Sequence, residues 1–248
     1  MKQLCNVCKS ELNKVFTKRV LEKYDVIYYQ CSNCKLLQTE NPYWLEEAYN
    51  QAISSTDSGY IGRNILMSRI TLIVFYSLFK TKDAFLDFAG GYGLFARLMN
   101  DYGLRFYWDD KYTQGIFARG LEYDNQKIKA VTCFECFEHF QDPVVELKKI
   151  LELSNTILFS TTLISEKELP DTDTWGYYGF EHGQHIAFYT EKSLRTLAKM
   201  FNLHFYTDGK NIHMITHKKI SNTLFKFLVF LPKLQMDILL KKIIAMSH

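Results

Sequence analysis

The feature that most constrains the fold is a short apolar run that ends in a glycine-rich turn and continues into an amphipathic segment. Residues 84–88 read Ala-Phe-Leu-Asp-Phe, residues 89–93 read Ala-Gly-Gly-Tyr-Gly, and apolar side chains recur with helical spacing over residues 94–99. This pattern predicts a strand, a turn and a helix, the first unit of a doubly wound sheet whose ligands bind beyond the strand ends. Without a Cβ, Gly91 and Gly93 let the main chain approach a ligand closely.

The strand and helix rhythm continues along the chain, as in a parallel sheet built from βα units. The sequence therefore predicts an α/β fold with a doubly wound, mainly parallel Rossmann-like sheet, and 248 residues suffice for one such domain with a small appendage. The expected strands are 84–88, 104–108, 129–134, 156–160 and an antiparallel pair at 203–207 and 212–217, and the expected helices are 62–79, 94–102, 143–152 and 191–201.

The glycine turn is compatible with two kinds of ligand. A Gly-x-Gly-x-x-Ala pattern starts at Gly91, and Asp109 or Asp110 follows about 20 residues later, which satisfies the loose dinucleotide fingerprint. However, Asp87 lies directly before the glycines. A carboxylate there opposes a pyrophosphate and attracts a cationic amine or sulfonium. The turn thus favours a positively charged cofactor.

All six cysteines occur in Cys-x-x-Cys pairs. The first two pairs are separated by 22 residues, and two such pairs can close a tetrahedral site around zinc. A segment this short buries too little apolar surface to fold without a metal, and four thiolates leave no open coordination position. We therefore expect a structural zinc ribbon over residues 1–45. Its ligands are Cys5, Cys8, Cys31 and Cys34, whereas Cys133 and Cys136 are expected to pack in a strand end.

Taken together, these motifs resemble class I S-adenosylmethionine (SAM)-dependent methyltransferases. The turn at 84–93, the Glu-His and Asp-Pro pairs within 138–143 and the strand at 156–160 carry the resemblance. The histidine-bearing segment 175–190 resembles the substrate-side loop of a subgroup that has an N-terminal four-cysteine zinc ribbon and is often linked to surface-sugar biosynthesis. The resemblance covers roughly residues 1–217 and implies a SAM methyltransferase domain over residues 46–219. One departure is Ala89, where the family usually has glycine.

The resemblance also implies a cofactor site. Asp110, with Asp109 as the register alternative, takes the place of the acid that binds the ribose hydroxyls. Residues 54–64 are polar and glycine-punctuated, so they form either a lid over the cofactor or a plain linker, and Arg63 suits the carboxylate of the donor. The expected cofactor-binding residues are Asp87, Ala89, Gly90, Gly91, Gly93, Asp110, Phe134, Glu135, Tyr60 and Arg63.

Methyl transfer to a hydroxyl needs a group that draws off the proton, because an alcohol does not ionise freely at neutral pH. The densest supply of such groups lies at residues 181–185. His185 is the first choice as base and His182 the second, with Glu181 orienting one imidazole. The same three residues can instead hold a divalent metal, or the histidines can merely shape the site. His139, expected beside the cofactor, is a further catalytic candidate.

The resemblance implies an acceptor hydroxyl on a nucleotide-linked or surface sugar of the capsular or lipopolysaccharide kind. Trp175, Tyr177 and Tyr178 are expected to face this small-molecule acceptor. A net charge of +3 gives no indication of nucleic-acid binding. Two other functions stay open: an NAD(P)-dependent oxidoreductase, and a non-catalytic zinc-ribbon module that binds RNA or protein.

Residues 220–248 are expected to form amphipathic helices divided by Pro232. Residues 217–248 contain six lysines and one acid, Asp237. Residues 221–246 can therefore pack on their own domain, lie on an anionic membrane surface or form a dimer contact. Because the chain start lacks an apolar signal core and no apolar run reaches about 18 residues, we expect no export signal and no spanning helix. A cytoplasmic location with reduced cysteines is expected.

Overall fold

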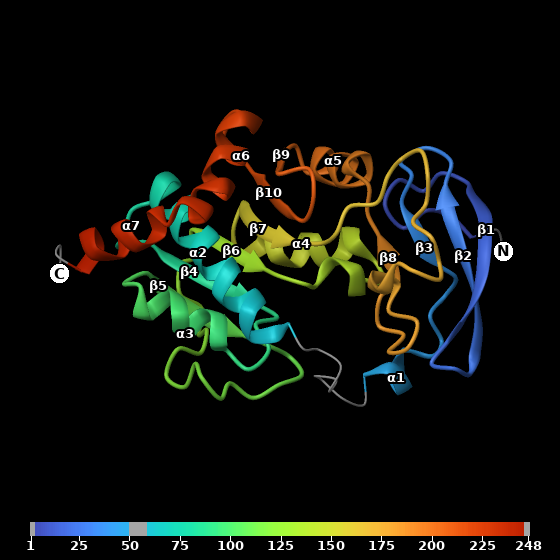
Figure 1. Ribbon diagram of the computed structural model, residues 1–248, viewed down its shortest axis with the longest axis horizontal. Coiled ribbons are helices and arrows are strands. Elements are labelled where there is room, and N and C mark those ends of the chain that lie inside the picture. Colours follow the sequence, from blue (N-terminus) through green and yellow to red (C-terminus); the bar gives the residue numbers. More distant parts are fainter. Residues whose placement is uncertain (1–2, 50–58, 246–248) are drawn as a thin grey trace.

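The computed structural model describes residues 3–49 and 59–245 and contains two sheets (Figure 1). The larger sheet has six strands in the order β5-β4-β6-β7-β10-β9. The first four of these are parallel, and β10 runs antiparallel to both of its neighbours. This confirms the mainly parallel α/β sheet. Its strands are β4 (Ala84–Phe88), β5 (Arg105–Asp109), β6 (Ala130–Cys133), β7 (Thr156–Ser160), β9 (His204–Thr207) and β10 (Ile212–Thr216).

Helices cover both faces of this sheet, which makes three layers (Figure 1). Apolar side chains of α4 and α5 pack on one face, and those of α2, α3, α6 and α7 pack on the other. Asp142 begins α4 by accepting hydrogen bonds from the N–H groups of Val144 and Val145. The helices are α2 (Tyr60–Leu78), α3 (Leu94–Asp101), α4 (Pro143–Leu153), α5 (Glu191–Met200), α6 (Asn222–Phe230) and α7 (Met236–Ala245).

Helix α2 differs from the sequence expectation in one respect. By length and composition alone its 19 residues are apolar enough to cross a membrane, although the sequence analysis predicts no spanning run. The middle of α2, residues 67–75, is largely buried in the core shared with the sheet. The predicted C-terminal helices lie against it, since Phe225, Leu228 and Ile244 are buried in the same core. Arg69 of α2 also forms an ion pair with the buried Asp237.

The smaller sheet combines the N-terminal segment with a distant part of the chain. Its four antiparallel strands are β1 (Leu12–Val20), β2 (Tyr24–Cys31), β3 (Leu37–Thr39) and β8 (Ala187–Phe188). Strand β8 belongs to the segment 175–190, and the sequence analysis did not predict it. The N-terminal strands and the segment 175–190 share a separate apolar core with α1 (Leu45–Ala48). The predicted boundaries at 45/46 and 219/220 stay predictions.

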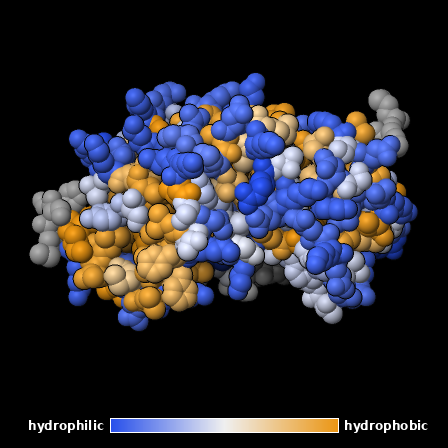
Figure 2. Space-filling view, turned by 90° about the horizontal axis from the view of Figure 1, so that it is seen from above, coloured by the Kyte–Doolittle hydropathy of each residue, from blue (hydrophilic) through white to orange (hydrophobic). Residues whose placement is uncertain are grey.

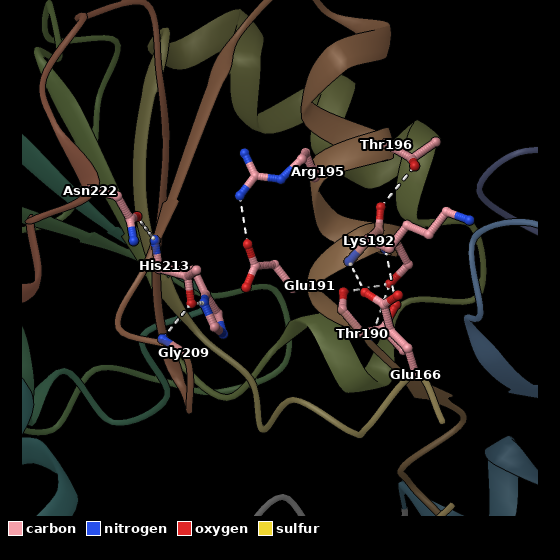
Figure 3. Close-up of polar contacts among 11 residues, drawn as sticks. Glu166, Thr190, Glu191, Lys192, Arg195, Thr196, Gly209, His213 and Asn222 are labelled. Atoms are coloured by element: carbon pink, nitrogen blue, oxygen red, sulfur yellow. Dashed lines mark hydrogen bonds and ion pairs between the residues drawn. The ribbon is translucent and has the colours of Figure 1, made fainter. Parts of the chain in front are cut away.

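Hydrogen bonds fix the segment on both sides of β8. The indole N–H of Trp44 donates to the carbonyl of Gly183 (2.8 Å), and the amide of Gln184 donates to the carbonyl of Ala48 (2.7 Å). After β8, the Thr190 hydroxyl donates to the carbonyl of Cys34 (2.9 Å). Figure 3 shows this start of α5, where Thr190 caps the helix and Glu166 accepts from the Lys192 N–H. The N-terminal ribbon thus holds the histidine-bearing loop in place.

Candidate active site

The glycine turn after β4 has a backbone that side chains would disrupt. A Cβ at Gly90 would collide with the Asp87 carboxylate and lie 2.7 Å from Cδ1 of Trp108. Gly93 has a φ of +79°, and its Cβ would collide with Ala118. A Cβ at Gly91, by contrast, would meet only the Tyr60 hydroxyl, at 3.7 Å. The main chain of Gly91 is therefore open to a ligand, and the turn fits a close-lying cofactor.

Ala89 occupies the turn position where the resembled family has glycine. Its φ is +55°, in the left-handed region that costs a residue with a Cβ about 1–2 kcal/mol. Ala89→Gly is therefore expected to raise the melting temperature by about 2–4 °C, the shift that about 1 kcal/mol gives in a protein of this size. Differential scanning calorimetry measures this. Ala130→Gly, within strand β6, is the control and should lower the melting temperature. A lower melting temperature for Ala89→Gly would contradict the proposed backbone strain at Ala89.

Asp87, the last polar side chain of β4, is a buried carboxylate with an exposed fraction of 3%. Its Oδ1 accepts a hydrogen bond from the Thr132 hydroxyl at 2.8 Å. Burial raises the pKa of Asp87 to about 7; the hydrogen bond from Thr132 opposes this, and the charge of Asp110 adds to it. A cationic ligand beside this carboxylate would favour its ionised form.

Asp110 lies at the mouth of the turn, one residue after β5. Its Oδ2 accepts from the N–H of Gly91 (2.9 Å), and its Oδ1 accepts from the N–H groups of Tyr112 (2.8 Å) and Thr113 (2.9 Å). Oδ2 can accept one further hydrogen bond. Asp109, the register alternative, is exposed at the end of β5.

The residues after β6 complete this edge of the sheet. Phe134 packs edge-on against Phe95 of α3, and Glu135 adopts a φ of +53°. The Ser160 hydroxyl donates to the Glu135 carboxylate at 2.5 Å and accepts from the Glu135 N–H at 2.9 Å. The expected cofactor residues of β4, β5 and β6 therefore lie at the carboxyl ends of adjacent parallel strands. Cys133 and Cys136 are buried there, as expected.

Tyr60 and Arg63 lie on the first turn of α2. The Tyr60 hydroxyl faces Gly91, and the positive charge of Arg63 contributes to lowering the pKa of His185. The structure therefore brings both side chains toward the site. Residues 54–58 of the predicted lid lie outside the described residues.

His139 and His185 meet beyond the end of β6, and the ring of His182 lies 4.8 Å from that of His185. The rings of His139 and His185 are 4.9 Å apart between centroids. Nδ1 of His139 lies 3.0 Å from the carbonyl oxygen of Gln184, and Nδ1 of His185 lies 2.6 Å from that of Tyr177. A carbonyl accepts only, so each Nδ1 carries hydrogen and each neutral ring keeps its lone pair on Nε2. Burial lowers the pKa of His139 to about 4. Burial also holds the pKa of His185 well below its usual value, and the charge of protonated His139 adds to this effect.

Glu181 and His182 do not lie as their predicted catalytic roles require. Glu181 is exposed, and Nδ1 of His182 accepts from the N–H of Gln184 (3.1 Å). The His182 ring lies against Gly179, where a Cβ would collide with it. The prediction that Glu181 orients a ligand-facing imidazole finds no support in these contacts, because a backbone carbonyl orients His185.

The expectation that Tyr178 faces the acceptor is wrong. Its exposed fraction is 1%, its hydroxyl donates to the carbonyl of Pro170 (3.0 Å), and it stacks on Phe180 in the ribbon core. Trp175 packs in the same core. Tyr177 lies nearer the histidines, with its ring 4.8 Å from that of His185.

The first four cysteines meet at one point of the ribbon, with their Sγ atoms within 4.8 Å of one another. Within each pair, a backbone N–H faces the sulfur three residues earlier: Cys8 N–H to Cys5 (3.5 Å) and Cys34 N–H to Cys31 (3.4 Å). The Cys34 thiol lowers the pKa of Cys5 to about 5. Four sulfurs this close, with N–H groups directed at two of them, fit a closed tetrahedral zinc site.

No curated protein matches the sequence. Three solved structures are similar at low identity. Mitomycin 7-O-methyltransferase MmcR is 14% identical, with 71% of this chain and 60% of that chain covered and a TM-score of 0.46, and plantazolicin methyltransferase BpumL in complex with SAH is 11% identical, with 70% and 93% covered and a TM-score of 0.48. Human N-acetylserotonin methyltransferase in complex with SAM is 12% identical, with 64% and 52% covered and a TM-score of 0.43. The chain thus spans 60% of the length of MmcR.

The family model described as a methyltransferase domain matches residues 63–207. The matched range runs from the first turn of α2 to the end of β9 and contains the glycine turn, Asp87, Asp110 and both site histidines. Because it spans more than half of the 248 residues, the chain belongs to the methyltransferase domain family.

Proposed function

We propose that this protein transfers a methyl group from SAM to a hydroxyl group of a small polar acceptor. The observation that carries the proposal is the buried Asp87 directly before an open glycine turn, in a chain of the methyltransferase domain family. A buried carboxylate at that place suits the amino and sulfonium charges of SAM and opposes a pyrophosphate. Asp110 is proposed to accept a hydrogen bond from a ribose hydroxyl, and its position beside Gly91 supports this.

Calorimetric titration of the purified protein with SAM, S-adenosylhomocysteine (SAH), NAD and NADP tests the cofactor. We expect SAM and SAH to bind and the two nicotinamide nucleotides not to bind. Binding of NAD or NADP instead would make the protein an oxidoreductase. No binding of any of the four would favour the non-catalytic zinc-ribbon module.

The affinity for SAM should depend on pH through Asp87. Its pKa of about 7 lies above the ordinary value, and the cationic donor needs the ionised carboxylate. The affinity for SAM should therefore be constant above pH 8. Below pH 7 it should fall with decreasing pH, and the slope should approach about tenfold per pH unit. Asp87→Asn should bind SAM about tenfold or more weakly at pH 8, since it loses a charge-assisted contact, and should lose this pH dependence.

Titrating both proteins with SAM between pH 5.5 and 8.5 gives the measurement. Asp101→Asn, on the exposed side of α3, is the matched control and should bind like the unaltered protein. Equal affinities of Asp87→Asn and the unaltered protein at all pH values would remove Asp87 from the cofactor site.

The acceptor is proposed to be a sugar hydroxyl, of a nucleotide-linked or surface sugar. The resemblance of residues 175–190 to the substrate-side loop of sugar-linked methyltransferases supports this, and Tyr177 lies beside the histidines in this loop. His185 is the proposed group that draws off the acceptor proton, because its Nδ1 is held by Tyr177 and its Nε2 keeps a lone pair. That lone pair can take the proton directly, as in the general-base prediction, or bind a cation that acidifies the hydroxyl. His139 shares this arrangement.

Zinc is proposed as a structural ion on the four ribbon cysteines. The clustering of their sulfurs supports it, and closed coordination gives the ion no catalytic position. The proposed location is a reducing cytoplasm, where cysteines stay available as metal ligands.

The C-terminal helices have an outer face that supports the proposed contact with a membrane surface or a second copy of the chain. Phe227, Leu234 and Leu239 are each more than half exposed. Figure 2 shows apolar side chains gathered at the end of the molecule that carries α7. Exposed lysines lie among them at 226, 233 and 242, as anionic lipid would require. Flotation with anionic vesicles and the mass in solution distinguish the two contacts.

A further inference from the structure

Glu138 is the most unusual side chain of the molecule. It lies in a single helical turn (Phe137–His139) that is separated from the end of β6 by three residues, and its exposed fraction is 0%. Neither carboxylate oxygen has a hydrogen-bond partner among the described residues. Burying a carboxylic acid without a hydrogen-bond partner is costly, so each such group in a folded protein needs an explanation, and a bound ion is one of them. The proposed proton transfer at His185 does not use Glu138.

The two site histidines lie close to this carboxylate, as do the hydroxyls of Tyr177 and Thr161. One carboxylate oxygen of Glu138 and one ring nitrogen each of His139 and His185 lie within 4.8 Å of one another. Both rings donate from Nδ1 to a backbone carbonyl, of Gln184 and of Tyr177. Metal-binding histidines are typically held in this way, because a carbonyl on one nitrogen fixes the ring and leaves the other nitrogen for the metal.

From these contacts we infer that Glu138, His139 and His185 bind a divalent first-row transition-metal cation on the acceptor side of the cofactor site. Two imidazoles and one carboxylate suit Mn²⁺, Fe²⁺ or Zn²⁺, and three protein ligands leave positions open for substrate oxygen. The cation would supply the partner that the Glu138 oxygens lack. The inference rests on the proposed methyl transfer to a hydroxyl, and it gives His185 the role of ligand in that reaction.

The ligand set differs from the one that the sequence suggests. In the sequence, Glu181, His182 and His185 are the nearest group that can hold a metal. In the structure Glu181 is exposed and His182 accepts a backbone N–H on Nδ1. The carboxylate that reaches His185 comes instead from Glu138, across 47 residues of chain.

This site would activate the acceptor without a separate base. The acceptor hydroxyl oxygen binds an open position of the cation, which lowers the hydroxyl pKa, and the proton leaves to water. The oxygen electron pair then forms a bond to the methyl carbon. The bond from that carbon to sulfur breaks, and sulfur keeps the electron pair. The products are the methyl ether, neutral thioether SAH and one proton, so atoms and charge balance.

Titration with Mn²⁺ tests the inference without knowledge of the acceptor. The full chain, dialysed to remove loosely held metal while its ribbon zinc is retained, is titrated with Mn²⁺ and followed by electron paramagnetic resonance. One Mn²⁺ per chain is expected. Glu138→Gln and His139→Gln should each weaken this binding by at least about tenfold. His204→Gln, an exposed histidine on β9, is the matched control and should bind as the unaltered chain does.

Titration with SAH on the same samples reports whether each variant is folded and separates the two proposals. If SAH binds but Mn²⁺ does not bind at millimolar concentration, the metal site is wrong and the proposed cofactor stands. Mn²⁺ binding that persists unchanged in both Glu138→Gln and His139→Gln would also overturn the site. If SAH does not bind to the unaltered chain, the proposed function itself fails.

Discussion

Replacing Cys5 and Cys8 together by serine is expected to remove one zinc ion per chain and to reduce methyl transfer by about 100-fold, while SAH still binds. Zinc contributes on the order of 10 kcal/mol to the folding of a small metal module, so the ribbon should unfold locally without it. The ribbon does not contain the cofactor turn, but its strand β3 pairs with β8. His185 lies two residues before β8, in the loop that Trp44 holds through Gly183.

Loss of the ribbon therefore acts on the acceptor side. A displacement of His185 by about 1 Å is enough for a loss of about 100-fold in rate. Asp87 and Asp110 form their hydrogen bonds with residues in the range 91–132, which belong to the larger domain. The cofactor turn therefore does not depend on the ribbon for these contacts, and SAH affinity should stay within a few fold.

Native mass spectrometry gives the metal count, and calorimetry with SAH gives the cofactor affinity. The control is Cys133→Ala with Cys136→Ala, which alters the third Cys-x-x-Cys pair and should leave the zinc in place. A double serine variant that still holds zinc, or a folded protein that never contained any, would refute the ribbon site.

The sequence was sufficient for the central sheet because its signals are local. The strand at 84–88 ends in a turn whose glycines exclude side chains, and the strand at 156–160 is a short apolar run; both lie where they were expected. The helix expected at 143–152 is also present as α4, which begins at Pro143 after the capping residue Asp142. Such signals depend on the chemistry of adjacent residues, so one sequence reveals them.

Contacts between segments that are distant in the chain cannot be predicted from the pattern of one sequence. Strand β8 is two residues long and exists because β3 offers it an edge, which periodicity cannot show. Its aromatic ring and its place in the histidine-bearing loop predict that Tyr178 faces the acceptor, but the apolar core beside the small sheet buries it. Glu138 was visible next to His139, yet its burial and its approach to His185 depend on how the loop folds back over β6.

His185→Gln is expected to lower kcat for methyl transfer by about 100-fold to 10,000-fold, the usual contribution of a group that handles the substrate proton. Whether Nε2 takes the proton or binds the cation, glutamine removes the lone pair that does so. The His185 ring contacts those of His139 and Tyr177, and its Nδ1 donates to the Tyr177 carbonyl. Because these contacts belong to the acceptor side rather than to the glycine turn, SAH affinity should be unchanged and the loss should fall on turnover.

Methyl transfer from labelled SAM to a panel of sugar nucleotides, with SAH titration on the same samples, measures both quantities. His204→Gln controls for the loss of a histidine. His182→Gln should cost much less than His185→Gln: the His182 ring lies 4.8 Å from that of His185, but its Nδ1 accepts from the Gln184 N–H, so Nε2 of the neutral ring carries hydrogen and offers no lone pair. The direction of rescue separates the two roles of His185. If it is a direct base, added imidazole should restore part of the rate and Mn²⁺ should not. If it is a ligand, raising Mn²⁺ should restore part of the rate, since Glu138 and His139 still hold the ion weakly. Full activity of His185→Gln would remove this histidine from the reaction under either role.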